Sequence, residues 1–189
     1  MDFLIADTHH LHNNILNFEK KTRGRFETAE EMTEHMINEW NSVVSDGDTV
    51  YHNGDISING SYAKIAPILE RLNGNIILIQ GNHDDTKVCK KLLENGLISE
   101  FHRVGVVLKR EKQSMWLTHY PMQIGLRERK WSIHGHIHSE PSKDPNQLNV
   151  GVDSYFMNEV LKVPFGQPVP IDTVVEYMLN NPITVERRN

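Results

Sequence analysis

The sequence predicts an α/β fold built on a largely parallel β-sheet, followed by a second sheet of shorter strands. In the first half, aliphatic runs alternate with amphipathic helical segments in the order strand, helix, strand, helix, strand. Such alternation implies right-handed crossovers and parallel strands. After Gly96 the pattern changes to short β-rich segments separated by turns. Polar residues that follow parallel strands face one crevice, and we expect a functional site there.

Length and composition indicate one soluble domain over residues 1–189. The chain has 189 residues and a mass of 21.8 kDa, with 38% hydrophobic and 24% charged residues, which is typical of globular proteins. The apolar run at 3–6 is too short for a signal peptide, and no later run approaches membrane-spanning length. We therefore expect a cytoplasmic protein with no membrane partner. The sequence leaves the oligomeric state open.

Charge and residue usage narrow the function classes. A net charge of −5 argues against indiscriminate binding to nucleic acid or anionic membranes. Basic clusters at 20–25, 109–112 and 127–130 are interpreted as solvated surface. The single cysteine, Cys89, excludes an intramolecular disulfide and a cysteine-based metal site, so it is interpreted as a small helix residue. Histidine is frequent, with 11 copies, and it often binds metals or moves protons near neutral pH.

The first predicted strand, at 2–6, ends in a polar segment that contains three histidines. Because alternate strand residues share a face, Asp7 and His9 are expected to project side by side from the end of this strand. A carboxylate and an imidazole so placed can hold one cation. The alternative is a helix N-cap by Asp7 or Thr8 with incidental histidines, and this stretch alone favours that alternative.

The first predicted helix begins at a capping box formed by Thr28 and Glu31. Apolar residues recur after it at helical spacing, so this face is assigned to the core: Met32, Met36, Trp40, Val43 and Val44. A second strand is expected at 49–52, before Gly54-Asp55, and a second helix over roughly 61–72, closing at Asn73-Gly74.

The third strand, at 76–79, has four consecutive aliphatic residues and matches a strand covered on both faces. It stops at Gly81-Asn82-His83-Asp84, where the glycine lets the backbone turn sharply. A short helix at about 85–95 then ends at Asn95-Gly96. The turn taken alone is evenly balanced between an ordinary polar turn and a functional one.

The second half is expected to form strands at 101–109, 115–118, 131–134 and 148–152, and a helix at about 172–180. Two of these strands again end in histidine, at His119 and at the segment from His134 to His138. Spacing by two is expected to put His136 and His138 on one strand face, roughly 6–7 Å apart along the chain. That separation suits two neighbouring metal ions.

The polar segments resemble, in their order along the chain, the five motifs of the calcineurin-like metallophosphoesterase superfamily. They are Asp7-Thr8-His9, Gly54-Asp55, Gly81-Asn82-His83-Asp84, His119 and Gly135-His136-Ile137-His138. The short spacing, together with the segment 149–153, resembles the compact bacterial and phage members. The resemblance implies a four-layer α/β/β/α sandwich with two mixed sheets and a two-metal site between the strand ends.

The resemblance also implies a ligand set, in which one ion is bound by Asp7, His9 and His138, the other by Asn82, His119 and His136, and Asp55 bridges the two. Imidazole, carboxylate and amide oxygen suit divalent manganese, iron, zinc or nickel, and manganese is favoured. Two divalent ions and two carboxylates leave about +2 for a phosphate substrate. A shared hydroxide would attack the phosphorus.

Further residues are candidates for catalysis or substrate binding. By the resemblance, His83 contacts a phosphate oxygen or protonates the leaving group, and Asp84 fixes its ring through a hydrogen bond. His12, Asn13 and Arg25 are candidate substrate contacts, with a helix start or solvated surface as the alternative. His52 and His134 lie next to motif residues, and either support a ligand or are structural.

The predicted activity is metal-dependent hydrolysis of phosphodiester or phosphomonoester bonds, on small or nucleotide-type substrates. A nuclease acting on DNA or RNA, and a catalytically silent scaffold of the same fold, are the alternatives. Protein phosphatases of the superfamily carry a Val-Asp-Arg-Gly signature and Gly-Asn-His-Glu, whereas this chain has Ile56-Ser57-Ile58 and Asp84. That difference argues against protein substrates.

Overall fold

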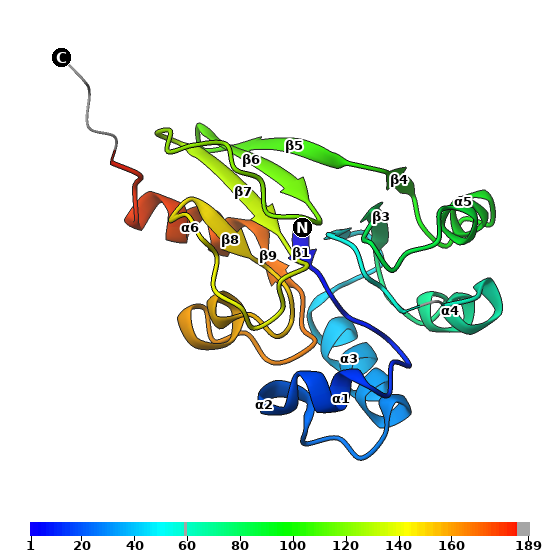
Figure 1. Cartoon of the computed structure of the whole chain (residues 1–189). Coiled ribbons are helices and arrows are strands. Elements are labelled where there is room, and N and C mark those ends of the chain that lie inside the picture. The colour runs from blue at the N-terminus through cyan, green and yellow to red at the C-terminus, as the bar shows by residue number, and fades with distance from the viewer. Residues whose placement is uncertain (59, 185–189) are drawn as a thin grey trace.

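The computed structural model describes residues 1–58 and 60–184, which form two mixed β-sheets and their helices (Figure 1). The first sheet has the order β4-β3-β2-β1-β9, and its strands are β1 (Asp2–Ile5), β2 (Thr49–His52), β3 (Asn75–Ile79), β4 (Glu100–His102) and β9 (Val169–Pro170). The second has the order β5-β6-β7-β8, with β5 (Gly105–Arg110), β6 (Gln113–Thr118), β7 (Lys130–His134) and β8 (Gln147–Asn149). The predicted α/β class with two mixed sheets is confirmed.

The first sheet is parallel at its centre, as the alternating pattern predicts. Phe3 of β1 lies opposite Val50 of β2, which lies opposite Ile76 of β3, and all three strands run the same way. The short β9 pairs with β1 in the antiparallel direction. The carboxyl ends of β1, β2 and β3 therefore meet at one edge, where the polar segments begin.

Both faces of this sheet are covered by apolar side chains. Phe3 and Ile5 pack in one core cluster with the helices, whereas Leu4 and Ala6 pack in a second cluster with β6, β7 and the C-terminal helix. Because successive residues of a strand point to opposite faces, a strand buried on both sides must be apolar throughout. This accounts for the aliphatic runs, and it makes the strand ends rigid supports.

Helices α3 (Ala29–Val43), α4 (Tyr62–Leu69) and α5 (Thr86–Glu94) supply side chains to the first core cluster, and Figure 1 shows them on one side of the first sheet. The Thr28 hydroxyl accepts a hydrogen bond from the Glu31 N–H at 3.1 Å, which confirms the predicted cap. Short helices α1 (Ile15–Phe18) and α2 (Lys20–Arg23), a π-helix (Phe156–Val160) and α6 (Ile171–Asn180) complete the set that the structure describes.

Helix α4 ends at Leu69, three residues before the predicted boundary. The turn that follows is hydrogen-bonded to α3. Trp40 Nε1 donates to the carbonyl of Asn73 at 2.9 Å, and the Asn73 N–H donates to Asn41 Oδ1 at 2.9 Å. Residues 70–72 form tighter turns, in which the Arg71 N–H donates to Ile68 O and the Leu72 N–H to Leu69 O at 3.1 Å, and the tertiary hydrogen bonds fix Asn73 after them.

The strand predicted over 101–109 is wrong as a single element. It is two strands in different sheets: β4 pairs with β3 in the first sheet, and β5 pairs with β6 in the second. Val104, between them, is strongly exposed. Apolar residues typical of strands occur on both sides of the junction, so the sequence pattern does not reveal the crossing between sheets.

The strand predicted over 148–152 is also shorter, because β8 ends at Asn149. Beyond it, the backbone pairs with the other sheet: the Ala6 N–H donates to Val150 O at 3.1 Å and the Val152 N–H donates to Ala6 O at 3.2 Å. The two sheets are thus joined by backbone hydrogen bonds immediately before Asp7. None of the helices that the structure describes is long and apolar enough to cross a membrane.

Candidate metal centre

The loops that follow β1 and β2 are held together by backbone hydrogen bonds. The Asp7 N–H donates to Gly54 O at 3.0 Å, and the His9 N–H donates to Asp55 O at 3.1 Å. This pairing continues past the strand ends. It brings the first two polar segments of the sequence into one site.

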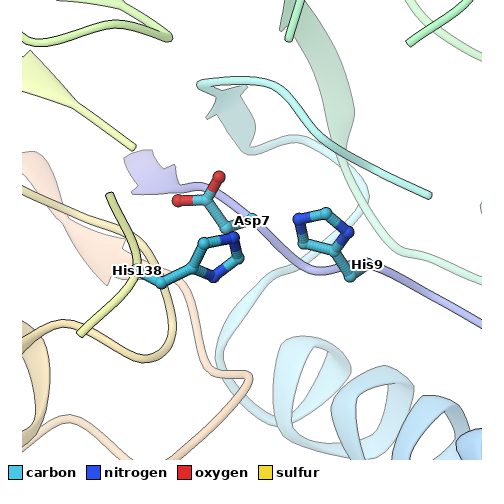
Figure 2. A group of neighbouring side chains, drawn as sticks. All are labelled: Asp7, His9 and His138. Carbon is cyan, nitrogen blue, oxygen red and sulfur yellow. The ribbon is translucent and has the colours of Figure 1, made fainter. Parts of the chain in front are cut away.

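Asp7, His9 and His138 form a group whose potential ligand atoms all lie within 4.8 Å of one another. Figure 2 shows the three side chains gathered between the loop after β1 and the loop after β7. The ring centroids of His9 and His138 are 5.0 Å apart. The structure therefore brings together the residues that the resemblance assigns to one ion.

From the spacing of the ligands we expected strand alternation to place them. The structure places them differently. Strands β1 and β7 end at Ile5 and His134, and the residues beyond them turn out of strand geometry. Positive φ angles occur at Asp7 (57°), His9 (48°), Asp55 (59°), His136 (70°) and His138 (48°). Each such left-handed residue costs about 1–2 kcal/mol, and strain of this kind concentrates at functional sites.

The surroundings of His9 indicate whether these residues suit a cation. Its side chain is buried, and neither ring nitrogen has a hydrogen-bond partner among the described residues. Burial and the nearby Arg23 charge lower the pKa of His9 strongly, so its imidazole is neutral and has a lone pair to donate. An unsatisfied buried nitrogen that faces a carboxylate and another imidazole fits a metal ligand.

A second group of potential ligand atoms comprises Asp7, Asp55 and His119. Asn82 Oδ1 extends it, because this oxygen lies 2.8 Å from His119 Nε2 and 2.8 Å from His136 Nδ1. The amide oxygen and both imidazoles thus converge at one place. The residues that the resemblance assigns to the other ion also lie together.

Asp55 lies between the two groups. Its Oδ2 is 3.6 Å from His9 Nε2 and 3.4 Å from His119 Nε2. Its other oxygen, Oδ1, accepts the backbone N–H of His83 at 2.9 Å. One carboxylate oxygen therefore faces a ligand nitrogen of each group, which is the position a bridging ligand needs.

Hydrogen bonds orient two of the imidazoles. His119 Nδ1 donates to the Asn53 carbonyl at 2.9 Å, and His138 Nδ1 donates to Asp153 Oδ2 at 3.0 Å, so the Nε2 of each ring is left for the site. Burial opposes the charged form of both rings, but the carboxylates of Asp55 and Asp153 raise the pKa of His119 and His138, respectively. Metal binding must displace those protons.

Glycines allow close approach to the carboxylates. A Cβ at Gly135 would lie 2.5 Å from Asp7 Oδ2, and one at Gly81 would overlap Asp55 Oδ1. Burial raises the pKa of Asp7 to about 6, although its oxygens accept the His136 N–H at 3.0 Å. A bound cation would favour the ionised form.

Asp84 has different partners from those expected. Among the described residues it makes no hydrogen bond to the ring of His83. Its carboxylate accepts the backbone N–H groups of Gly81 and Asp55 at 2.8 Å and of Ile56 at 3.0 Å. Burial raises the pKa of Asp84 to about 6, against the effect of these donors. The side chain ties the loop after β3 to the loop after β2, so the predicted hydrogen bond to His83 is wrong.

The remaining candidates differ in their proximity to the site. His83 is half-buried, and its ring centroid lies 5.4 Å from that of His9. His12 is buried, and its ring centroid lies 5.3 Å from that of His9. Asn13 is exposed, and its side chain accepts the Ala29 N–H at 3.4 Å. Arg25 is exposed and contacts His35 Nε2 at 3.1 Å. Arg25 lines a neighbouring cavity of about 560 Å³ and belongs to neither group of potential ligands.

The other motif-adjacent histidines have structural partners. His52 Nε2 contacts the Thr8 hydroxyl at 3.1 Å, and burial lowers the pKa of His52 to about 3. His134 contacts the Gly135 carbonyl and the Ser142 hydroxyl. Cys89 is buried in α5, within the first core cluster. These residues support the fold around the site.

Sequence reasoning missed Arg23 and Asp153. Arg23 belongs to the cluster at 20–25 that we interpreted as solvated surface, but it is fully buried and ion-paired with Asp153 at 2.7 Å. No local pattern distinguishes it from its exposed basic neighbours. Asp153 offered a weak signal, since it ends the segment 149–153 that carries part of the resemblance.

Comparisons with known proteins agree with this geometry. The family model described as calcineurin-like phosphoesterase matches residues 3–187. The uncharacterized protein MJ1445 of Methanocaldococcus jannaschii is 31% identical over 180 residues, covering 92% of this chain and 89% of that protein. The crystal structure of AQ665, a protein of unknown function from Aquifex aeolicus, has the same fold, with a TM-score of 0.68, 22% identity, and coverage of 94% of this chain and 98% of that one. The chain therefore belongs to the calcineurin-like phosphoesterase family.

Proposed function

We propose that the protein is a metal-dependent phosphoesterase with a dinuclear metal site, acting on small or nucleotide-type phosphate esters. The observation that supports this most is the position of Asp55 Oδ2, within 3.6 Å of His9 Nε2 and 3.4 Å of His119 Nε2. A single oxygen between two groups of ligand atoms is suited to two ions that share it. Family membership supports the reaction class.

In this proposal Asp7, His9 and His138 hold one ion, and Asn82, His119 and His136 hold the other. The donors are imidazole nitrogens, carboxylate oxygens and one amide oxygen, a mixed set that is compatible with manganese, the ion proposed here, and with iron, zinc or nickel as alternatives. When bound, two such ions would attract the phosphate and lower the pKa of a shared water. The overall charge of −5 is therefore compatible with a locally cationic site.

The proposed roles of the residues differ with their exposure to solvent. The ligands Asp7, His9, Asp55 and His119 are buried and fix the geometry, whereas Asn82 is exposed at the mouth of the site. His83 is half-buried beside it, and its N–H is anchored on Asp55 Oδ1. From there its ring can contact a phosphate oxygen or protonate a leaving group. His12, on another side of His9, is a second phosphate contact in this proposal.

Asp84 has a positioning role in this proposal. Its three backbone hydrogen bonds connect the segment that carries Asn82 and His83 to the bridging Asp55. Loss of the carboxylate would move ligands of both groups. In this proposal Asp84 acts through these backbone groups and does not contact the phosphate.

The substrate class is tested by a panel in which the protein is assayed with Mn²⁺ and, in parallel, after EDTA treatment. The panel comprises an aryl phosphate, a bis-aryl phosphate, 2′,3′- and 3′,5′-cyclic nucleotides, and single-stranded DNA and RNA. We expect hydrolysis of small esters that EDTA abolishes and Mn²⁺ restores. Cleavage of DNA or RNA alone would make it a nuclease. No activity from a protein that has bound its ions would favour a silent scaffold and overturn the proposal.

A further inference from the structure

Arg23 is a buried cation that no part of the proposed reaction uses. Its side chain is 0% exposed, in the short helix α2. A guanidinium stays protonated at every physiological pH, and burying it costs several kcal/mol unless its donors are satisfied. The hydrogen-bond partners of Arg23 therefore show which groups the buried charge holds in place.

The partners of Arg23 account for all five of its N–H groups. Nε and Nη2 donate to the Asp153 carboxylate at 2.9 and 2.7 Å. Nη2 also donates to the carbonyl of Asp7 at 2.6 Å, and Nη1 donates to the carbonyl of Thr8 at 2.9 Å and to Met32 Sδ at 3.5 Å. The guanidinium thus bridges two consecutive carbonyls of the loop after β1 and one carboxylate.

Those carbonyls belong to the strained part of the loop. Asp7 and His9 both have left-handed backbone angles, and Thr8 lies between them. A planar fork of donors that binds the carbonyls of residues 7 and 8 fixes the orientation of both peptide groups between the two ligands. The carboxylate on the other side of the fork accepts His138 Nδ1 at 3.0 Å and so orients the third ligand.

We propose that Arg23 is the positioning residue of the ligand group Asp7, His9 and His138. It reaches Asp7 directly, the peptide before His9 through Thr8, and His138 through Asp153. None of its hydrogen bonds among the described residues reaches Asp55, Asn82, His119 or His136. The inference rests on the proposed dinuclear site, and it assigns Arg23 to one of the two ions.

The pairing also explains why a buried cation is tolerated beside a cationic site. Asp153 neutralises Arg23, and it accepts a further hydrogen bond from the Thr22 hydroxyl at 2.6 Å. The pair therefore adds no net charge that would repel an ion. A role in folding alone would also need satisfied donors, so a selective effect on one of the two ions is what distinguishes the two roles.

The test compares Arg23→Lys with the wild-type protein. Lysine keeps the charge but lacks the planar fork, so it cannot hold both carbonyls and Asp153 together. We expect calorimetric titration with Mn²⁺ to show one of the two ions bound roughly 10–100-fold more weakly, with the other changed less than about threefold. Anomalous diffraction of Mn²⁺-loaded crystals should show the loss at the position next to Asp7, His9 and His138.

The control is Arg71→Lys. Arg71 is also ion-paired through its guanidinium, to Glu34, but this pair lies on the exposed surface and not at the site. The Arg71→Lys variant should bind both ions as the wild-type protein does. Circular dichroism and thermal unfolding of each metal-free variant separate lost ligand geometry from lost folding.

A double substitution, Arg23→Met with Asp153→Leu, keeps the test decisive if Arg23→Lys does not fold. Replacing both members of a buried ion pair by apolar residues of similar size is often tolerated. We expect this double variant also to bind the ion next to Asp7, His9 and His138 more weakly than the other ion. Retention of both ions, or equal weakening of both, in the folded variants overturns the role of Arg23 while leaving the dinuclear site intact. A wild-type protein that binds none of Mn²⁺, Fe²⁺, Zn²⁺ or Ni²⁺ overturns the proposed function, and the role of Arg23 with it.

Discussion

The carboxylate of Asp84 accepts a hydrogen bond from the backbone N–H of Asp55 at 2.8 Å. The same carboxylate accepts the N–H groups of Gly81 and Ile56, and so joins two loops that carry ligands. We expect Asp84→Asn to lower the free energy of unfolding of the metal-free protein by about 1–3 kcal/mol at pH 8, because the amide replaces an acceptor with a donor. Urea unfolding measures this change.

The matched control for Asp84→Asn is the neighbouring Asp85→Asn. Asp85 caps α5 by accepting the N–H groups of Lys87 and Val88. Asparagine is an equally good N-cap, so this variant should unfold like the wild-type protein. If both variants unfold at the same urea concentration, the backbone contacts of Asp84 do not contribute to stability.

We expect His83→Ala to lower turnover roughly 10²–10⁴-fold while leaving both ions bound, because the ring is a proposed acid or phosphate contact and not a ligand. Metal content by mass spectrometry and kcat under Mn²⁺ saturation measure the two effects separately. His102→Ala is the control, since His102 is paired with Glu100 on β4. An unchanged kcat in His83→Ala would remove His83 from the chemistry.

We expect Asp55→Asn to break the pairing of the two ions. The substitution removes one negative charge and leaves a neutral amide facing His9 and His119. Anomalous diffraction after soaking with Mn²⁺ should then show at most one fully occupied position. Two full peaks in this variant would show that Asp55 is not a required bridge.

The sequence predicts β1 and β3 of the first sheet well because strands buried on both faces must be apolar throughout, as 76–79 illustrates. The motif order then suggests which residues meet. What local patterns do not predict is how they meet: Asp7 and His9 are placed by left-handed backbone angles and not by strand alternation. The burial of Arg23 depends on Asp153, 130 residues away in sequence, so no local pattern can reveal it.

Metal binding is expected to release protons. Although burial disfavours the charged rings, neighbouring carboxylates raise the pKa of His119 and His138 above 6.5 in the metal-free protein. A ligand imidazole must be neutral, so metal ions compete with protons for both rings. The affinity for metal ions should therefore rise with pH until the pH exceeds the raised pKa values of His119 and His138. Calorimetric titrations at pH 6, 7 and 8, in two buffers of different ionisation enthalpy, measure the protons released. An affinity independent of pH would contradict this linkage.

The buried, neutral His52 should make the metal-free protein sensitive to acid. Burial lowers the pKa of His52 from 6.5 to about 3, so between these values the unfolded chain binds a proton that the folded protein does not. The contribution of His52 to stability is complete above pH 6.5 and is lost as the pH falls toward 3. The free energy of unfolding should therefore fall by about 1.4 kcal/mol per pH unit below 6.5 from this residue.

The substitution His52→Gln isolates that contribution. Glutamine can keep the hydrogen bond to the Thr8 hydroxyl but does not titrate. Between pH 7 and pH 5 in EDTA, the wild-type protein should lose about 2 kcal/mol more unfolding free energy than the variant. Asp7 and Asp84, whose pKa values burial raises to about 6, act in the opposite direction but are present in both proteins, so their effect cancels in the difference. Equal losses in the two proteins would mean that His52 is protonated in the folded state.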